Sequence, residues 1–309
     1  MRTQPSPWPD NKAFAFTIFD DTDRATLEGC EAIYGCLRDA GIFTTKTVWM
    51  EDGDHPPIIP GVTCSNQPYL KWLKTLQNEG FEIAWHNATW EGSKRDRTAR
   101  LLEKFRQEFG RYPATMANHA SNEESIYWGS ARFSSATGAL YKLLSKNRFS
   151  GHDPSSPWFW GDLCKQHIKY VRNFTFDSLN TLRVSPWMPY HDPTRPWVNA
   201  WFSGSNGADL RSFNEILHES SLDKLAEEGG LCILYTHFGK GFYDGKSLNC
   251  RFVELIRRLG RMNGWFVPAE TLLDHLKTLN GGVVEIGKKQ LLNMEFKWLL
   301  DQSTRLLHR

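Results

Sequence analysis

The chain has 309 residues, of which 40% are hydrophobic and 23% charged, so it can bury one large core or form two domains. Its formal net charge is +2, with Lys and Arg scattered among acids, so nucleic-acid binding has little electrostatic support. No stretch is apolar for long enough to cross a bilayer, and residues 1–9 lack the apolar run of a secretory signal, so we expect a cytoplasmic globular protein.

Strands and helices are predicted to alternate over the first part of the chain. Apolar and β-branched runs predict strands, and 3.6-residue periodicity predicts the helices between them, each ending near a glycine. We expect Ser93 to cap the third helix. The predicted elements are a strand at 14–19, a helix at 27–40, a strand at 43–49, a helix at 69–79, a strand at 81–85, a helix at 93–109 and a strand at 114–117.

The middle of the chain is irregular. Residues 118–209 are rich in Trp, Pro, Gly and Asn, which predicts long loops with strands only at 168–176 and 186–190. Regularity then returns with a helix at 210–228, a strand at 231–235, a helix at 248–261 and a strand at 265–268. Alternation of this kind favours a parallel α/β fold, either a barrel or an open sheet.

The end of the chain has a different pattern. Gly281 and Gly282 interrupt the alternation, and apolar residues at helical spacing follow at 291–307. We therefore expect a barrel domain over 1–280 and a helical extension over 281–309. The extension is expected to pack on the barrel; a helix that binds a partner or forms a dimer is the alternative.

Four of the apolar runs end abruptly in residues that can bind a metal or move a proton. The carboxyl ends of parallel strands meet on one face, so such residues can share a pocket although they are far apart in sequence. A mononuclear metallohydrolase needs a pocket of this kind. The residues at these strand ends are Asp20 and Asp21, His86, Asn118 and His119, and Thr236 and His237.

Three of these strand ends resemble the motifs of one enzyme family. Residues 16–21, Phe-Thr-Ile-Phe-Asp-Asp, resemble the T-F-D-D strand end of the polysaccharide deacetylases, the carbohydrate esterase family four enzymes. Residues 80–86, Gly-Phe-Glu-Ile-Ala-Trp-His, resemble their G-H-E-I-x-x-H motif, and residues 231–237 are similar to the late strand that ends in their acid histidine. The resemblance covers about residues 14–279 and implies an α/β fold, an incomplete or distorted (β/α) barrel.

The same resemblance implies roles for individual residues. Asp20 corresponds to the general base, Asp21 and His86 to metal ligands, and His237 to the acid that protonates the leaving amine. Adjacent carboxylates at a strand end point in different directions, so one can bind a divalent cation while the other takes a proton from water.

The chain also departs from the family pattern. Trp90 stands where the family has a second ligand histidine, and we expect His119 to replace it, with Asn118 or Asn122 as competitors. One carboxylate and two histidines suit a catalytic zinc site, although imidazole also suits iron, nickel and cobalt. The family's Arg-Pro pair is replaced by Met-Ala-Asn-His at 116–119, so the group that orients the base is not identified.

The expected function is that of a metal-dependent hydrolase that removes an acetyl group from an N-acylated sugar or sugar-containing precursor. Two alternatives stay open: a metal-dependent amidase acting on a non-sugar amide, and a catalytically silent barrel that binds glycans. Tryptophans of the irregular section could offer faces on which sugar rings stack. They are Trp158, Trp160, Trp187, Trp197 and Trp201.

Overall fold

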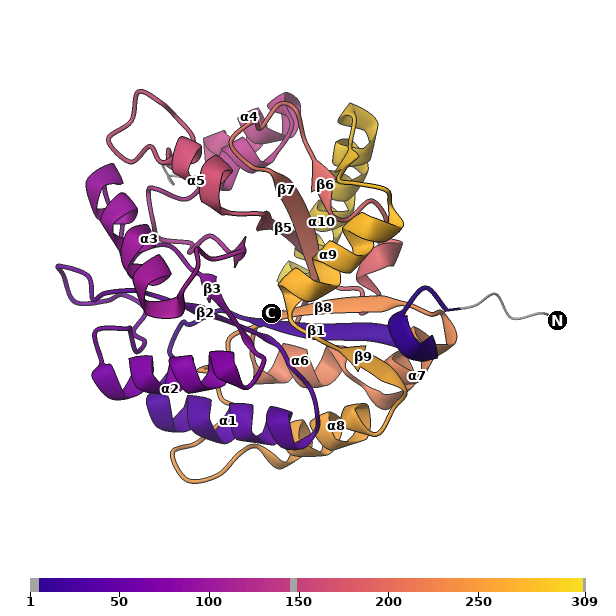
Figure 1. Cartoon of the computed structure of the whole chain (residues 1–309). Coiled ribbons are helices and arrows are strands. Elements are labelled where there is room, and N and C mark those ends of the chain that lie inside the picture. Colours follow the sequence, from indigo (N-terminus) through magenta and orange to yellow (C-terminus); the bar gives the residue numbers. More distant parts are fainter. Residues whose placement is uncertain (1–5, 145–148, 308–309) are drawn as a thin grey trace.

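A closed barrel of seven parallel strands lies at the centre of the computed structural model, which describes residues 6–144 and 149–307 (Figure 1). Each strand pairs in parallel with its neighbour, and β7 pairs with β8 to close the barrel. This confirms the predicted (β/α) barrel, which has one strand fewer than the complete eight-stranded form. The barrel strands are β1 (Phe14–Asp20), β2 (Thr45–Val48), β3 (Glu82–Trp85), β4 (Thr115–Met116), β5 (Tyr170–Phe176), β7 (Ala200–Asn206) and β8 (Leu231–Thr236).

Three short strands extend the sheet beyond the barrel. β9 (Gly264–Phe266) pairs in parallel with β1. β6 (Tyr190–His191) runs antiparallel to β7, and β10 (Val284–Glu285) pairs in parallel with β6. The strand predicted at 186–190 is therefore a two-residue element at its far end.

Helices surround the barrel (Figure 1). In the first of them, Thr26 accepts a hydrogen bond from the Gly29 backbone, and Ile33 and Leu37 are buried against the core. The α-helices are α1 (Leu27–Asp39), α2 (Gln67–Asn78), α3 (Arg95–Phe109), α4 (Ser135–Leu144), α5 (Gly161–His167), α6 (Leu210–Ile216), α7 (Glu219–Glu227), α8 (Cys250–Gly260), α9 (Ala269–Leu279) and α10 (Lys288–Leu307). Short 3-10 helices are η1 (Pro9–Asn11), η2 (Gly129–Arg132) and η3 (Thr181–Arg183).

Two helix predictions are wrong in detail. The residue before α3 is Lys94, with no side-chain cap, whereas the Ser93 backbone N–H donates to Glu124. The single helix predicted at 210–228 is two helices, because His218 leaves the helical path and caps α7. The first difference comes from a long-range hydrogen bond and the second from a local one, in which His218 accepts from the Ser220 backbone.

Strand β7 was missed because its second half is small and polar. Its sequence, Ala-Trp-Phe-Ser-Gly-Ser-Asn, lacks the apolar run of the other barrel strands. The glycine has a packing reason, since a Cβ at Gly204 would lie 2.9 Å from the backbone oxygen of Ile233 in β8. A residue without a side chain therefore lets the two strands that close the barrel approach each other.

The C-terminal helix is tied to the barrel. Trp298 of α10 packs against Phe133 and Phe174, with ring centroids 5.2 and 6.1 Å apart, and Glu295 accepts a 2.8 Å hydrogen bond from Ser134. Packing of the extension on the barrel was expected. The boundary at residue 280 and the partner-binding alternative stay predictions, and residues 308 and 309 of the extension lie outside the described residues.

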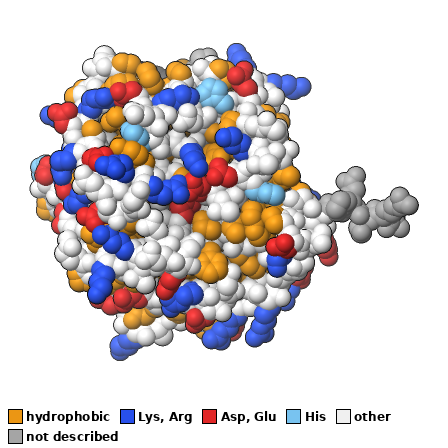
Figure 2. Space-filling model, in the orientation of Figure 1, with side chains coloured by type: hydrophobic (Ala, Val, Ile, Leu, Met, Phe, Trp, Pro, Cys, Tyr) orange, Lys and Arg blue, Asp and Glu red, His pale blue; other side chains and the backbone are white. Residues whose placement is uncertain are grey.

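Acidic and basic side chains are interspersed over the face seen in Figure 2. None of the helices in the described ranges combines the length and apolar character of a membrane span. The cytoplasmic location stays a prediction, and part of the N-terminal segment on which it was based, residues 1–5, lies outside the described residues.

Candidate metal centre and active-site pocket

A pocket of about 240 Å³ lies at the carboxyl ends of the barrel strands. Its lining comes from loops or ends of β1, β3, β4, β5, β7 and β8, and from η2 and α10. Side chains distant in sequence therefore meet there, as parallel-barrel topology requires. The lining residues with ionisable side chains are Asp21, Asp23, His86, His119, Arg132, Arg172, Tyr235, His237 and Arg305.

Asp20, the predicted base, does not line this pocket. Its carboxylate is fully buried and accepts hydrogen bonds from the Lys46 ammonium at 2.8 Å, the Tyr34 hydroxyl at 3.1 Å and the Phe238 backbone at 2.9 Å. Burial raises the pKa of Asp20, although the Lys46 charge opposes this. These contacts tie β1 to β2, to α1 and to the loop after β8, which is a structural arrangement.

Asp21, the predicted metal ligand, lines the pocket but is paired with an arginine. Both of its oxygens accept hydrogen bonds from Arg172 of β5, at 2.7 and 2.6 Å. Burial favours the protonated acid, but the guanidinium outweighs it and holds the pKa of Asp21 below its usual value. Asp21 is thus an ionised, oriented carboxylate.

Asp23, which our sequence reasoning missed, lies at the centre of the histidines. The alternation of side chains along β1 continues into the loop, because the Asp21 backbone N–H still bonds the oxygen of Thr236 in β8. Asp21 and Asp23 therefore line the pocket, whereas Asp20 bonds to α1. A third acid two residues after the pair was the available signal.

His86 is oriented by a hydrogen bond on its far nitrogen. Nδ1 lies 3.1 Å from the backbone oxygen of Ala117, which can only accept, so Nδ1 carries a proton. Nε2 lies 3.1 Å from an Asp23 oxygen and 3.9 Å from an Asp21 oxygen. A neutral His86 would present a lone pair to these carboxylates, so the position calls for a cation, either a proton or a metal ion.

His119 has the same arrangement. Nδ1 lies 2.7 Å from the Asn122 oxygen, whose amide nitrogen donates to the backbone oxygens of Thr89 and Glu91, so Nδ1 is the donor. Nε2 is buried without a hydrogen-bond partner in the part of the chain that the structure describes. Burial and the neighbouring His86 lower the pKa of His119, which favours the neutral, metal-binding form.

His237 approaches Asp23 from β8. Its Nδ1 lies 2.6 Å from the backbone oxygen of Ala208, and its Nε2 lies 3.3 Å from the second oxygen of Asp23. The Tyr235 hydroxyl lies 3.2 Å from the same Nε2. His86 and His237 therefore face different oxygens of one carboxylate. These two contacts outweigh burial and hold the pKa of Asp23 well below its usual range.

The donor set fits a metal ion. Among the described residues, Asp23, His86 and His119 form a group whose ligand atoms all lie within 4.8 Å of one another, and all three residues are buried. Each imidazole is held by its other nitrogen, as ligating histidines usually are. The two histidines are those predicted from the sequence, and the carboxylate of the group is Asp23 rather than Asp21.

The two asparagines considered as alternatives to His119 have other partners, and the tryptophans named from the sequence lie outside the pocket. Asn118 uses its amide to bond both backbone groups of Ile126, and Asn122 orients His119. Trp160 and Trp201 are buried in the core, and none of the five tryptophans named from the sequence lines the pocket. Its tryptophans are Trp128, which precedes η2, and Trp298 of α10.

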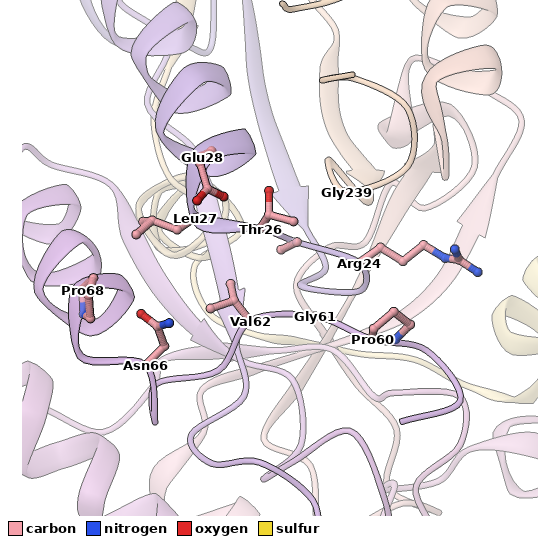
Figure 3. A pocket seen from close by; sticks show the side chains of 11 residues that line it. Arg24, Thr26, Leu27, Glu28, Pro60, Gly61, Val62, Asn66, Pro68 and Gly239 are labelled. Carbon is pink, nitrogen blue, oxygen red and sulfur yellow. The ribbon is translucent and has the colours of Figure 1, made fainter. Parts of the chain in front are cut away.

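A larger hollow of about 710 Å³ is lined in part by the β1–α1 loop (Figure 3). Arg24, Thr26 and Glu28 line it together with Pro60 and Gly61 of the loop before α2. It contains neither the histidines nor Asp21 and Asp23, so it lacks the groups needed for metal-dependent hydrolysis.

No protein-family model and no curated protein sequence match this chain. Solved structures do. A provisionally identified polysaccharide deacetylase from Mycobacterium smegmatis superposes with a TM-score of 0.55 at 14% identity, over 93% of this chain and 98% of that one. A second, from Pseudomonas aeruginosa PAO1, gives a TM-score of 0.50 at 14% identity, over 90% of this chain and 95% of that one. Over most of its length, the chain therefore has the fold of the polysaccharide deacetylases.

Proposed function

We propose that this protein is a metal-dependent hydrolase that removes an acetyl group from an N-acylated sugar or sugar-containing precursor. One observation carries the proposal: three imidazole Nε2 atoms, from the ends of β3, β4 and β8, converge on the carboxylate of Asp23. A second carboxylate, Asp21, lies beside them and is paired with Arg172. The names of the structurally similar proteins support deacetylation as the reaction class.

In this proposal Asp23, His86 and His119 hold the divalent cation. Zinc is the first choice, because one carboxylate and two imidazoles leave positions for water and substrate. When bound, the cation would polarise the acyl carbonyl and acidify a water molecule. The proposal differs from the sequence-based ligand set by replacing Asp21 with Asp23, since Asp21 already spends both oxygens on Arg172.

Asp21 then takes the role of the base. It lies in the pocket beside the ligands, whereas Asp20 is enclosed by Lys46, Tyr34 and the backbone. Arg172 would supply the orienting arginine that the 116–119 segment lacks. A carboxylate kept ionised in this way is a weak base, so it would serve as the proton acceptor only for a water molecule that is more acidic than bulk water.

His237 is the proposed general acid. Its Nδ1 donates to the Ala208 backbone oxygen, so Nε2 faces the pocket, and in the imidazolium form Nε2 carries the proton that the departing amine receives. Nε2 lies 3.3 Å from an oxygen of Asp23, a proposed ligand, so this proton would be beside the proposed reaction centre. Such positioned proton transfer contributes ~10²–10⁴-fold to the rate.

The volume of the pocket limits the part of the substrate that can enter it. A cavity of about 240 Å³ is below the ~300–1,000 Å³ of typical ligand pockets, so it suits one acylated sugar ring or a small non-sugar amide. The substrate panel should therefore contain N-acetylated sugars, nucleotide sugars and simple amides.

Metal content and acetate release test the proposal together. We expect one divalent ion per wild-type chain and its loss in His86→Ala and His119→Ala, with acetate released only by metal-loaded protein. His167→Ala is a matched control, because this histidine stacks on Tyr112 and is not among the residues that line the pocket. Undiminished metal content in either ligand variant, or a metal-loaded wild type inactive on the whole panel, would contradict it.

A further inference from the structure

Three arginines line the active-site pocket, and they differ in how their charges are balanced. Arg172 is paired with Asp21 at 2.6 Å, and Arg305 of α10 is paired with Asp177 at 2.6 Å. Arg132 of η2 has no carboxylate within 4.0 Å among the described residues. It is the arginine of this pocket whose charge the described chain leaves uncompensated.

Arg132 is nevertheless held in a defined place. Its Nε donates to the side-chain oxygen of Asn173 at 3.1 Å, and one terminal nitrogen donates to the backbone oxygen of the same residue. The guanidinium carbon lies 4.4 Å from the ring centres of Trp128 and Phe174 and 5.3 Å from that of Trp298. Aromatic faces and a neutral amide position the group without neutralising it.

A charge in this position is costly to maintain. Only 8% of Arg132 is exposed, and removing a cation from water is unfavourable unless a counter-charge or hydrogen bonds replace the lost hydration. Burial lowers the pKa of Arg132 to about 9, so the side chain is still cationic at neutral pH. Its second terminal nitrogen makes no hydrogen bond within the described residues, and the residue lines the pocket.

We propose that Arg132 binds an anionic group of the substrate, a carboxylate or a phosphate, so that the protein acts on an acidic acylated sugar rather than a neutral one. This inference rests on the proposed function for the identity of the reaction, but the anion preference is a binding property that can be measured by itself. Charge-assisted hydrogen bonds from guanidinium to such oxyanions are short and strong.

Strand β5 contributes two consecutive residues, Arg172 and Asn173, to the same pocket. Its pairing with β7 shifts register between Arg172 and Thr175, and both Arg172 and its neighbour Asn173 line the pocket. Such irregularities redirect side chains near active sites. Arg172 can therefore hold Asp21 while Asn173 holds Arg132, which separates the group that orients a catalytic carboxylate from the group that receives the substrate's charge.

Equilibrium binding to the full chain tests the inference. The probes are N-acetylglucosamine, its 6-phosphate, and N-acetylmuramic acid, which adds a carboxylate to the same sugar. We expect the wild type to bind at least one acidic probe roughly 10-fold or more tightly than the neutral sugar. Arg132→Gln should abolish this preference, and Arg132→Lys should retain part of it because the charge remains.

The matched control is the double variant Asp177→Asn with Arg305→Gln. It removes the guanidinium of Arg305 together with its carboxylate partner and leaves the net charge unchanged. The anion preference should therefore persist. A preference that survives Arg132→Gln belongs to the metal centre and overturns the inference. A wild type that shows no preference, whether it binds every probe or none, also overturns it, even if the glutamine variant fails to fold.

Acetate release from the same probes separates the two proposals. If acidic probes bind tightly through Arg132 but none releases acetate, the hydrolase proposal is contradicted and the anion site stands. If neutral and acidic probes release acetate with equal kcat/KM, the hydrolase proposal stands and the anion site is contradicted.

Discussion

Asp20 and Asp21 are neighbours on the chain but belong to different regions of the molecule. Asp20 bonds Lys46 in the adjacent strand and Tyr34 of α1, so it lies between the barrel and its helices. Asp21 bonds Arg172 of β5, which is not a neighbour of β1 in the sheet, so this pair spans the barrel mouth. Strand alternation therefore assigns one ion pair to structure and the other to the pocket.

Charge and burial alone therefore do not show which aspartate could take part in the proposed reaction. Both aspartates are buried, and both are paired with a cation. What separates them is access: Asp21 lines the pocket with Asp23 and the histidines, and Asp20 does not. If access to the pocket decides the role, changes at the pocket residues should impair the reaction, and changes at Asp20 should impair folding.

The largest effect is expected from Asp23→Ala. Removing the central carboxylate should abolish acetate release and weaken metal affinity by more than the ~10–100-fold typical of losing a residue that only orients a ligand. Asp20→Asn should leave the metal content unchanged. Metal titration and acetate assays on both variants measure this, and metal loss in Asp20→Asn alone would reverse the assignment of the two regions.

His237→Gln should keep the metal but lose proton transfer. We expect kcat to fall by ~10²–10⁴-fold, because the glutamine cannot protonate the leaving amine. His167→Gln, a substitution outside the pocket, should leave kcat unchanged. Steady-state kinetics with metal content measured in parallel decides the matter, and a His237→Gln protein depleted of metal would instead identify His237 as a ligand.

Asp20→Ala should affect folding. It leaves the Lys46 ammonium buried and unpaired, and breaking a buried pair in this way typically lowers the free energy of unfolding by about 3–5 kcal/mol. The double variant Asp20→Ala with Lys46→Met removes both charges, so it should recover part of the loss. Urea unfolding measures both values, and equal stability of wild type and Asp20→Ala would contradict a structural pair.

The smallest effect is expected for the pH dependence of stability, through Glu124, a buried acid that contacts the proposed metal ligands only indirectly. Glu124 accepts hydrogen bonds from Asn122, which orients His119, and from the Ser93 backbone. Burial raises the pKa of Glu124 to about 7 from 4.5. Above pH 4.5 the unfolded chain releases this proton and the folded chain keeps it, so stability falls as pH rises from about 4.5 to 7, by about 3 kcal/mol.

Glu124→Gln should remove that part of the pH dependence. Its amide nitrogen replaces one of the two accepting oxygens, so we expect a loss of about 1–3 kcal/mol near pH 4.5, and this difference should shrink as the wild type loses stability toward pH 7. Unfolding free energies measured from pH 4.5 to 8 for both proteins show the difference in slope. An unchanged slope in the glutamine variant would assign the proton to another group.

Local pattern was sufficient for much of the fold and part of the site. Apolar runs ending in His86 and His237 predicted strands whose ends face one pocket, and both histidines lie there. The pattern failed at β7, where Gly204 and its serine neighbours look like a loop. It also failed at Arg132 and Arg172, whose roles come from partners about 40 and 150 residues away in sequence.

Short-range periodicity was enough to predict the α/β class, the order of most elements outside residues 118–209 and the histidines that face the pocket. Which aspartate each cation binds does not follow from short-range periodicity. The choice among Asp20, Asp21 and Asp23 depends on which face of β1 meets Lys46, Arg172 or the imidazoles. These contacts join residues that are far apart in sequence, and they form only when the barrel closes.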